Sequence, residues 1–348
     1  MERIIKCSEA IREAIDQEMT LDERVIVLGQ GIDDAKGMWG TTLGLQKKYG
    51  AERVFDTPLA EDGMTGVAIG AALGGLRPIH THIRMDFLVL AMNQLVNIAA
   101  KSRYMYGGSV KVPLVVRAVI GRSWGQGAQH SQALHSWFAH IPGIKVVMPA
   151  TAYDAKGCLI QAIRDDNPVL FVEHRMVHQA ESHVPPESYT VPLGRARVLA
   201  AGSQLTIVAT GHMVMESMRA QTALEKAGLS VEVIDPVTIS PLDTETIFAS
   251  VEKTGRLLVV DNGWLNCGFS AELIARAAEH FQNRNGIRYG RMGFAPVTCP
   301  TTKVLENEFY PDVRRIANRA AEMIQPGKPE PIGPQEEAPE ITQFKGPF

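Results

Sequence analysis

The chain has 348 residues, of which 45% are hydrophobic and 21% charged, and its formal net charge is −3. This composition is typical of a soluble globular protein, and the length is enough for two domains. The small net charge gives no reason to expect nucleic acid or an anionic membrane as a partner. The four cysteines lie far apart and form no Cys-x-x-Cys pair, so we expect neither a disulfide framework nor a zinc knuckle.

The N-terminal segment, residues 1–19, has the pattern of an amphipathic helix that carries acidic side chains. It lacks the apolar centre of a signal peptide and the acid-poor composition of a transit peptide. No apolar run approaches the length that spans a bilayer. With the separated cysteines, these features predict a cytoplasmic protein.

Strand-like and helix-like segments then alternate along the first half of the chain. Short runs rich in Val, Ile and Leu occur at 24–29, 53–58, 77–83, 112–119, 144–150 and 169–174, with helical patterns at 41–50, 86–108 and 153–167. Such runs, separated by helices, are typical of a parallel sheet that is buried on both faces. The glycines Gly63, Gly66 and Gly70 lie between two of them, and the absence of a GxxxxGK[ST] motif favours close helix packing there over phosphate binding.

A second α/β series begins after a Pro-rich stretch. Strand patterns at 205–210, 229–239 and 256–263 alternate with helical patterns at 213–228, 243–253 and 270–281. The fold class is therefore α/β, with two domains that each contain a parallel sheet. We place the first domain at 1–180, a linker at 181–200, the second domain at 201–325, and a Pro- and Glu-rich tail at 326–348, which we expect to be disordered or laid on a partner.

Histidines raise the question of a metal site. His130, His135 and His140 are five residues apart, and on one helix this spacing turns each by about 140° from the last, so they cannot share a metal-binding face. His80 and His82 would point to one face of a strand, which leaves a possible metal pair without an identifiable third ligand.

Several segments, read in order, resemble one family. They include RVFDTPLAEDGMTGVAIGAALGGLRPI (53–79), DFLVLAMNQLVNIAAKSRYMYGG (86–108), GAQHSQ, IPGIKVVMPATAYDAKG, IDPVTISPLD (234–243) and FAPVTCPTTKVLENEFYPD. The chain resembles, over nearly all of residues 3–320, the β subunit (E1β) of thiamine-diphosphate-dependent 2-oxo acid dehydrogenases of the pyruvate, branched-chain and acetoin type. The resemblance implies a transketolase-like, pyrimidine-binding domain followed by a transketolase-type C-terminal domain.

The same resemblance implies partners and a cofactor. Such β subunits form an α2β2 heterotetramer with an E1 α subunit, act on a small 2-oxo acid or acetoin, and pass the acyl group to a lipoyl-bearing E2 protein. Thiamine diphosphate lies between the subunits, with its aminopyrimidine on β and its diphosphate and Mg²⁺ on α. The chain agrees with this division, because it contains no GDG…N motif for diphosphate and Mg²⁺.

Site residues carry over position by position. Glu61 matches the acid that protonates the aminopyrimidine N1′, which lets the cofactor's amino group remove the thiazolium proton; the alternative is an acid at a helix N-terminus. Phe87 matches the aromatic that stacks on the pyrimidine, and Leu59 and Ile83 match positions beside that ring. His130 matches the active-site histidine of the family, and an imidazole is a side-chain type suited to proton transfer.

Five further positions match a segment that holds K⁺ through backbone groups in some relatives. They are Val112, Ala162, Ile163, Asp165 and Asn167; a plain turn without an ion is the alternative. His135 is expected to pack or to line a subunit interface, and His140 to precede the IPG turn.

Three positions depart from the family pattern. Gln30 replaces the acid of GED, Thr81 replaces the acid of RPxxE, and Val297 stands where a histidine is common. Because ionisable groups are missing, and His80, His82 and Trp124 are added nearby in sequence, we predict an altered substrate pocket or an altered fate of the acyl group.

Two other functions remain open. In the first, the α/β pair acts as a transketolase- or acyloin-synthase-like carboligase that passes the thiamine-bound carbanion to an aldehyde. In the second, the chain is a degenerate subunit that only scaffolds a partner. The presence of Glu61, Phe87 and His130 argues against the scaffold. Lipoamide-dependent NADH formation would separate the dehydrogenase from the carboligase.

Overall fold

Two compact units make up the chain. The computed structural model describes residues 3–34, 36–122, 125–328, 330, 332, 333 and 341. The first unit contains residues up to Arg122 together with Gln129–Leu193, and the second contains 125–128 and the described residues from Gly194 on. None of the helices among these described residues is long and apolar enough to cross a membrane.

A parallel sheet forms the centre of the first unit, with its strands in the order β6-β7-β5-β4-β2-β3. The strands are β2 (Val25–Gly29), β3 (Val54–Asp56), β4 (Arg77–His82), β5 (Val115–Ile120), β6 (Lys145–Val147) and β7 (Val169–His174). Every residue of β2, β5 and β7 is buried, which explains their largely apolar sequences. A separate antiparallel pair joins β1 (Ile4–Lys6) to β8 (Glu181–His183).

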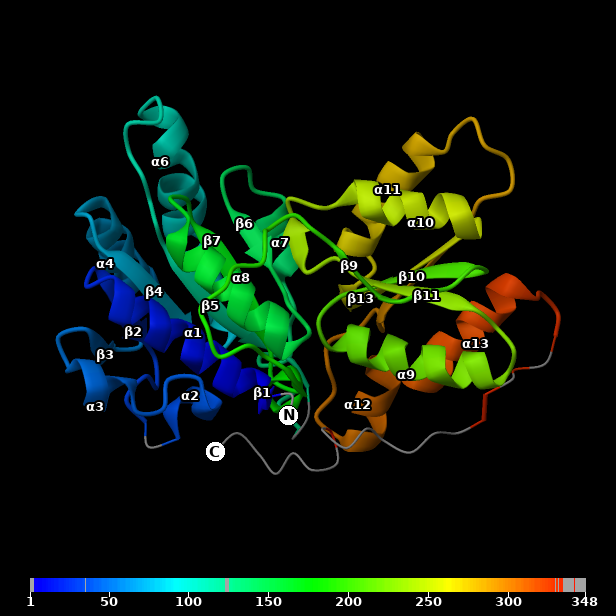
Figure 1. Ribbon diagram of the computed structural model, residues 1–348, viewed down its shortest axis with the longest axis horizontal. Helices are drawn as coiled ribbons and strands as arrows, with labels where there is room; N and C mark the ends of the chain where they lie inside the picture. The colour runs from blue at the N-terminus through cyan, green and yellow to red at the C-terminus, as the bar shows by residue number, and fades with distance from the viewer. Residues whose placement is uncertain are drawn as a thin grey trace. The chain divides into compact units, whose positions relative to one another are not determined.

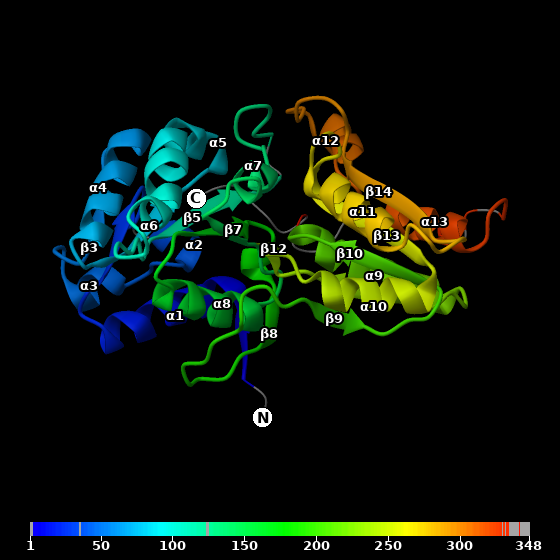
Figure 2. The same ribbon diagram turned by 90° about the horizontal axis from the view of Figure 1, so that it is seen from above.

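Helices cover both faces of this sheet. Figure 2 shows α1 and α8 on one face and α4 and α6 on the other. The helices of the unit are α1 (Cys7–Leu21), α2 (Gly37–Gly40), α3 (Leu45–Tyr49), α4 (Glu61–Leu73), α5 (Met85–Leu88), η1 (Val89–Ala91), η2 (Gln94–Ala99), α6 (Ala100–Met105), α7 (His135–Ala139), α8 (Ala152–Arg164) and η3 (Val177–Gln179).

Two expected helices differ in detail from the structure. The pattern at 41–50 forms only the short helix α3, because Gly40 and Gly44 adopt positive φ angles of 89° and 78°, which interrupt a right-handed helix. The pattern at 86–108 does form one helical stretch, but its hydrogen bonding changes from α to 3₁₀ to π and back to α.

The glycines of α4 are less packed than we expected. A Cβ at Gly66 would lie 3.8 Å from the side chain of Gln94, but at Gly63 and Gly70 it would meet no described atom within 4 Å. Packing of another helix against this stripe therefore occurs within the described chain only beside Gly66.

The second unit repeats the α/β plan on its own sheet, whose strand order is β14-β13-β10-β11-β9. The strands of this sheet are β9 (Arg197–Ala200), β10 (Leu205–Ala209), β11 (Val231–Asp235), β13 (Arg256–Trp264) and β14 (Arg288–Phe294). The short strand β12 (Thr238–Ser240) belongs to the second unit but not to this sheet. Only β9 is antiparallel to its neighbour in this sheet. Two short strands, β8 and β9, thus lie in the range 181–200 that we expected to be a linker.

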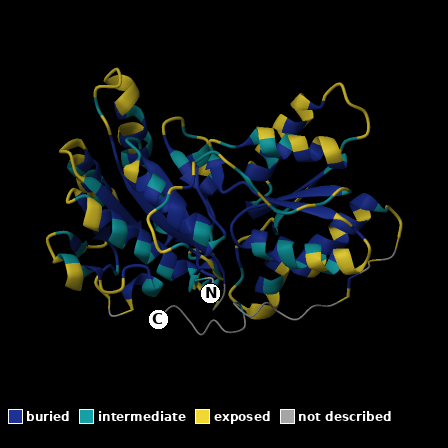
Figure 3. Ribbon diagram, viewed as in Figure 1, coloured by how far each residue is buried: buried dark blue, intermediate teal, exposed yellow. Residues whose placement is uncertain are grey.

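Helices flank this second sheet as well. They are α9 (His212–Lys226), α10 (Thr244–Thr254), α11 (Phe269–His280), α12 (Lys303–Phe309) and α13 (Val313–Ile324). Figure 1 shows α10 and α11 on one face and α9 and α13 on the other. In both units the central strands are buried, and exposure is concentrated on the outer helices, the loops and some edge strands (Figure 3). These features confirm the α/β fold class with two sheet-containing domains.

Candidate active site

The first part of the candidate site is a hydrogen bond between Gln30 and Glu61. The Nε2 atom of Gln30 donates to the Oε1 atom of Glu61 over 2.9 Å. Gln30 follows directly after β2, and its backbone N–H donates to the carbonyl of Thr81 at 3.2 Å. The departure at position 30 therefore lies in contact with the predicted cofactor acid.

Gly29 allows this backbone arrangement. Its φ is +145°, and a Cβ at this position would lie 2.2 Å from the carbonyl oxygen of Thr81. Only glycine tolerates both the conformation and this close approach of two main chains. The main chain at Gln30 is thus held in place, which fixes the position from which the Gln30 side chain extends.

Glu61 is the first residue of α4, where a negative charge is favoured by the helix dipole. Its half-buried carboxylate accepts from a residue of another element, so it does more than cap its own helix. Leu59, two residues earlier, is 82% exposed. A carboxylate can accept a hydrogen bond from a protonated ring nitrogen, and an exposed apolar side chain can contact the face of a planar ring.

The second part of the site pairs Phe87 with His130. Their ring centroids are 5.2 Å apart with an interplanar angle of 79°, an edge-to-face contact. Phe87 lies in α5, which follows β4, and His130 lies in the loop between β5 and α7. Residues 43 positions apart in sequence, 130 minus 87, are therefore neighbours.

Ile83 lies near the first of these two parts. A Cβ at Gly31, next to Gln30, would lie 3.3 Å from the Cδ1 atom of Ile83. Gln30, Ile83 and the loop with His130 follow β2, β4 and β5, which are adjacent and parallel. The predicted residues are therefore gathered at the carboxyl edge of the sheet, where α/β proteins bind ligands.

The added histidines lie beneath this edge. The rings of His80 and His82 are 4.4 Å apart, and the Nε2 atom of His80 lies 3.1 Å from the Oγ1 atom of Thr65 on α4. Burial lowers the pKa of His80 to about 4, and burial followed by the neighbouring His80 lowers the pKa of His82. Both rings are therefore neutral at pH 7.

No metal site emerges from the histidines. Within the part of the chain that the structure describes, no group of three or more His, Cys, Asp or Glu side chains could hold a metal ion. The premise that His130, His135 and His140 share one helix is wrong, because α7 begins at His135. His135 is buried and His140 is exposed.

Neither Val297 nor Trp124 is among the described residues of the first unit. Val297 belongs to the second unit and is 56% exposed, and its carbonyl accepts from the Nε1 atom of Trp264 at 3.0 Å. Trp124 lies outside the described residues.

The segment matched to a K⁺ site is held by Arg77. Its Nη1 atom donates to the carbonyls of Ile163 and Asp165 at 2.9 and 3.0 Å. The carbonyl of Ala162 accepts from the backbone N–H of Asp165 at 3.2 Å, and Val112 N–H donates to the carbonyl of Asp166 at 3.0 Å. Each carbonyl oxygen has a second lone pair that can bind an ion.

A buried ion-pair network escaped the sequence analysis. Glu173 on β7 accepts from the Nε and Nη2 atoms of Arg117 on β5 at 2.6 and 2.8 Å, and its Oε2 atom lies 2.9 Å from the Nε2 atom of His178. Burial would raise the pKa of Glu173, but Arg117 and then His178 outweigh it and lower the pKa to about 2. No local pattern reveals this pair, because 56 residues separate its two members.

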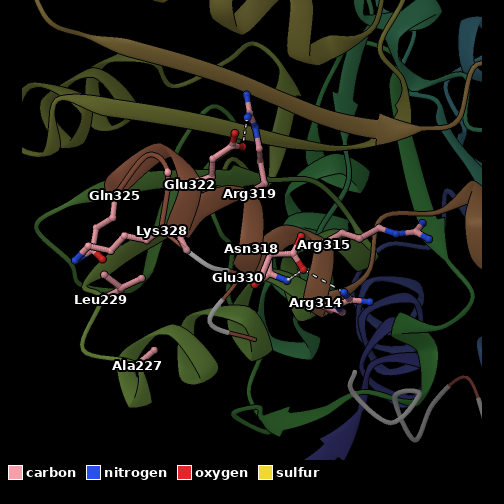
Figure 4. Close-up of a pocket in the computed structure, with 12 residues that line it drawn as sticks. Ala227, Leu229, Arg314, Arg315, Asn318, Arg319, Glu322, Gln325, Lys328 and Glu330 are labelled. Carbon is pink, nitrogen blue, oxygen red and sulfur yellow. Dashed lines mark hydrogen bonds and ion pairs between the residues drawn. The ribbon is translucent and has the colours of Figure 1, made fainter. Parts of the chain in front are cut away.

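A hollow of about 1000 Å³ lies in the second unit between α13 and the end of α9 (Figure 4). Several of its charged side chains are joined in ion pairs, as between Arg319 and Glu322 and between Arg314 and Glu330. Glu330 also accepts from Asn318, whose amide group pairs with the backbone of Ile332. None of the predicted site residues lines this hollow.

Comparisons with known proteins identify both domains of the chain. Residues 4–179 match the family model described as the transketolase pyrimidine-binding domain, and residues 194–316 match the transketolase C-terminal domain. A solved structure described as a split-gene transketolase in an inactive β4 tetramer superposes with a TM-score of 0.75. It covers 92% of this chain and 98% of that chain at 21% identity, which shows the fold alone.

Curated relatives are closer in sequence. The chain is 42% identical, over 94% of its length and 100% of the relative, to the β subunit of acetoin:2,6-dichlorophenolindophenol oxidoreductase from Cupriavidus necator. It is 40% identical, over 88% of its length and 87% of the relative, to the mitochondrial β subunit of the pyruvate dehydrogenase E1 component from Bos taurus. The chain therefore belongs to the transketolase-like family that contains the β subunits of pyruvate dehydrogenase E1 and of acetoin:2,6-dichlorophenolindophenol oxidoreductase.

Proposed function

We propose that this chain is the β subunit of a thiamine-diphosphate-dependent E1 enzyme that decarboxylates a 2-oxo acid or cleaves acetoin. The observation that carries the proposal is the carboxylate of Glu61, held by Gln30 at the carboxyl edge of a pyrimidine-binding domain. The names of the relatives support a dehydrogenase rather than a carboligase.

The residues present fit the aminopyrimidine half of the cofactor. One oxygen of Glu61 accepts from Gln30, which leaves the other oxygen for a proton at the ring N1′ atom. Phe87 offers an aromatic face, and Ile83 and Leu59 offer apolar contacts beside it. When bound, thiamine diphosphate supplies the electron sink for cleaving a bond next to a carbonyl carbon.

The chain's own residues then have separate tasks. Glu61 holds the proton at N1′, and Gln30 fixes the orientation of the carboxylate. His130 holds or delivers a proton at the oxygen of the substrate, as an imidazole does near neutral pH. Because Gln30 cannot exchange a proton as a carboxylate does, the substrate pocket or the fate of the acyl group differs from that of relatives with an acid there.

The remaining half of the site requires a partner. An E1 α subunit brings the diphosphate-binding groups and Mg²⁺ in an α2β2 heterotetramer, and a lipoyl-bearing E2 protein accepts the acyl group. We place this assembly in the cytoplasm. The reaction is that of an oxidoreductase acting on an oxo group with a disulfide acceptor, and the β subunit is active only with its α subunit.

Glu61→Gln tests the catalytic assignment. The chain is co-expressed with the α subunit of its own organism, and dichlorophenolindophenol reduction is followed with a panel of 2-oxo acids and acetoin. Loss of the acid should lower kcat by about 10²- to 10⁴-fold, the range of general acid catalysis. Glu272→Gln, at an exposed ion pair on α11, is the control. Wild-type protein with bound cofactor that reduces no dye with any substrate would contradict the proposal.

A K⁺ ion on the carbonyls of Val112, Ala162, Ile163, Asp165 and Asn167 belongs to the same proposal. Because the ion would tie the end of α8 to the turn before β7, KCl should raise the apparent Tm above that in NaCl at equal ionic strength. Identical melting curves in the two salts would argue for a turn held by Arg77 alone.

A further inference from the structure

Three successive residues at the start of α5 contact three alternate residues of the loop that carries His130. The sulfur of Met85 accepts from the backbone N–H of Leu134 at 3.1 Å. The Oδ1 atom of Asp86 accepts from the backbone N–H of Gln132 at 3.0 Å. Phe87 meets His130 edge to face. We call these contacts the 85–87/130–134 clasp.

Asp86 makes the strongest contact of the clasp. A carboxylate that accepts from a backbone N–H forms a charge-assisted hydrogen bond, whereas a thioether sulfur is a weak acceptor. The ring contact between Phe87 and His130 fixes a distance but leaves the imidazole free to slide along the ring edge. The register between loop and helix therefore depends mainly on Asp86.

The carboxylate of Asp86 is kept in an unfavourable place. The residue is 4% exposed, and its Oδ2 atom has no hydrogen-bond partner among the residues that the structure describes. Burial raises the pKa of Asp86, while its bonds to Gln132 and then the charge of Arg84 act in the opposite direction. Burying a partly unpaired carboxylate costs stability, so stability alone does not account for an acid at this position.

We propose that Asp86 is a positioning residue that holds the 130–134 loop in the register at which His130 stands edge-on to Phe87. His130 then meets the substrate at a fixed place beside the ring on which the pyrimidine stacks. The catalytic consequence rests on the function proposed above, whereas the clasp itself does not.

Asp86→Leu and Asp86→Asn form a matched pair of variants in the full chain. Asn keeps an oxygen acceptor for the Gln132 N–H, and Leu removes the acceptor at similar volume in a buried place. With ¹³C-labelled histidine, the His130 Hε1 resonance, assigned by its loss in His130→Gln, reports the ring-current shift from Phe87. We expect Asp86→Asn to keep this shift and Asp86→Leu to lose it, with unchanged far-UV circular dichroism.

Kinetics of the pair reconstituted with the α subunit give the second readout. Asp86→Leu should lower kcat by about 10- to 100-fold, since displacing a catalytic group by about 1 Å has effects of that order. KM and the Kd for thiamine diphosphate should change less than threefold, and Asp86→Asn should restore kcat to within about threefold of wild type.

Two results would overturn the proposal. One is an unchanged His130 shift in Asp86→Leu, and the other is a lost shift together with an unchanged kcat. Asp86→Ala replaces Asp86→Leu if the latter does not fold. If the wild-type pair is inactive with every substrate, the function proposed above fails, but the ring-current measurement still decides whether Asp86 holds the clasp.

Discussion

At position 30 a neutral amide donates to Glu61, where an acid would place two carboxyl groups in contact. An amide keeps one orientation of donor and acceptor and cannot give up a proton at neutral pH. A pair of carboxyl groups in contact instead shares a proton and titrates as a unit. The residue at position 30 therefore determines how many protons the pair holds at a given pH.

Gln30→Glu should lower kcat/KM at pH 7.5 and move the optimum of the pH profile to lower pH. At lower pH the introduced carboxyl group is protonated and can donate to Glu61 as the amide does. Gln30→Leu, which removes the donor without adding an acid, should lower kcat/KM at every pH and leave the shape of the profile unchanged. A Gln30→Glu profile that coincides with the wild-type profile would show that the contact has no role in catalysis.

Glu173 shows how a buried ion pair links stability to pH. Its folded-state pKa of about 2 lies below the ordinary value of 4.5, so the ionised form stabilises the folded state. This contribution, on the order of 3 kcal/mol, is fully present above about pH 5 and is lost as the pH falls towards 2.

Glu173→Gln removes this contribution and leaves Arg117 buried without its charged partner. We expect the free energy of unfolding at pH 7 to fall by about 3–5 kcal/mol. This should lower the apparent Tm by roughly 10 °C. The difference in apparent Tm between variant and wild type should become smaller as the pH falls from 5 to 2. Glu272→Gln at an exposed pair, 2.6 Å from Arg276, should change the Tm by less than about 1 °C at either pH. A constant gap across this range would contradict the assigned pKa.

At the scale of elements, the sequence predicted the strands better than the parts between them. Runs such as 24–29 and 169–174 become β2 and β7 with almost the same bounds, because parallel strands buried on both faces are largely apolar. We assigned no helix to 313–324, although its buried residues Val313, Ile316, Ala320 and Ile324 repeat at helical spacing. The helix at 313–324 could therefore have been predicted from the sequence. The shortening of the expected helix at 41–50 by two glycines with positive φ was harder to predict.

The long-range contacts of the site could not be predicted from the sequence. Glu61, Phe87 and His130 were named from the resemblance, but nothing local indicated that Gln30 would touch Glu61 or that Asp86 would hold the loop after β5. These contacts join residues that follow different strands. They depend on which strands are adjacent, and strand order follows from the whole fold rather than from any one segment.

Gly29→Ala tests how far β2 and β4 fix the site. The new Cβ would lie 2.2 Å from the Thr81 carbonyl at a φ of +145°, so β2 must shift and Gln30 must leave Glu61. We expect a strongly lowered Tm and weaker binding of thiamine diphosphate by the α/β pair. Gly44→Ala, also at a positive φ but with no described atom within 4 Å of its Cβ, should cost only about 1 kcal/mol. Equal effects of the two variants would show that the Thr81 contact is unimportant.

At the scale of the whole molecule, exposed apolar side chains recur on helices of the first unit. Val67 and Leu73 on α4, Ile98 on η2 and Met105 on α6 are each at least 39% exposed. Helix α4 packs against η2, and α6 continues directly from η2 in the same helical stretch. Apolar exposure of this kind is typical of a surface that is covered in an assembly, as the proposed α subunit requires.

Val67→Lys should therefore weaken capture of the α subunit by a tagged β chain at least tenfold, because it places a charge between Gly63 and Gly70 on α4. Val198→Lys on β9 of the second unit is the matched control, since Val67 and Val198 are 55% and 50% exposed. Both variants should keep the wild-type circular dichroism spectrum. Equal capture by both would place the α-binding surface elsewhere.

Gly29 has a consequence for how such enzymes diversify. Its glycine-only conformation, with the Gln30 N–H bonded to Thr81, fixes the main chain at position 30 independently of the side chain there. Selection, or a protein engineer, can therefore exchange the chemical group that faces Glu61 by a single codon change without rebuilding the backbone. A library of substitutions at position 30 alone would vary the number of protons that this residue and Glu61 hold together, on an unchanged backbone.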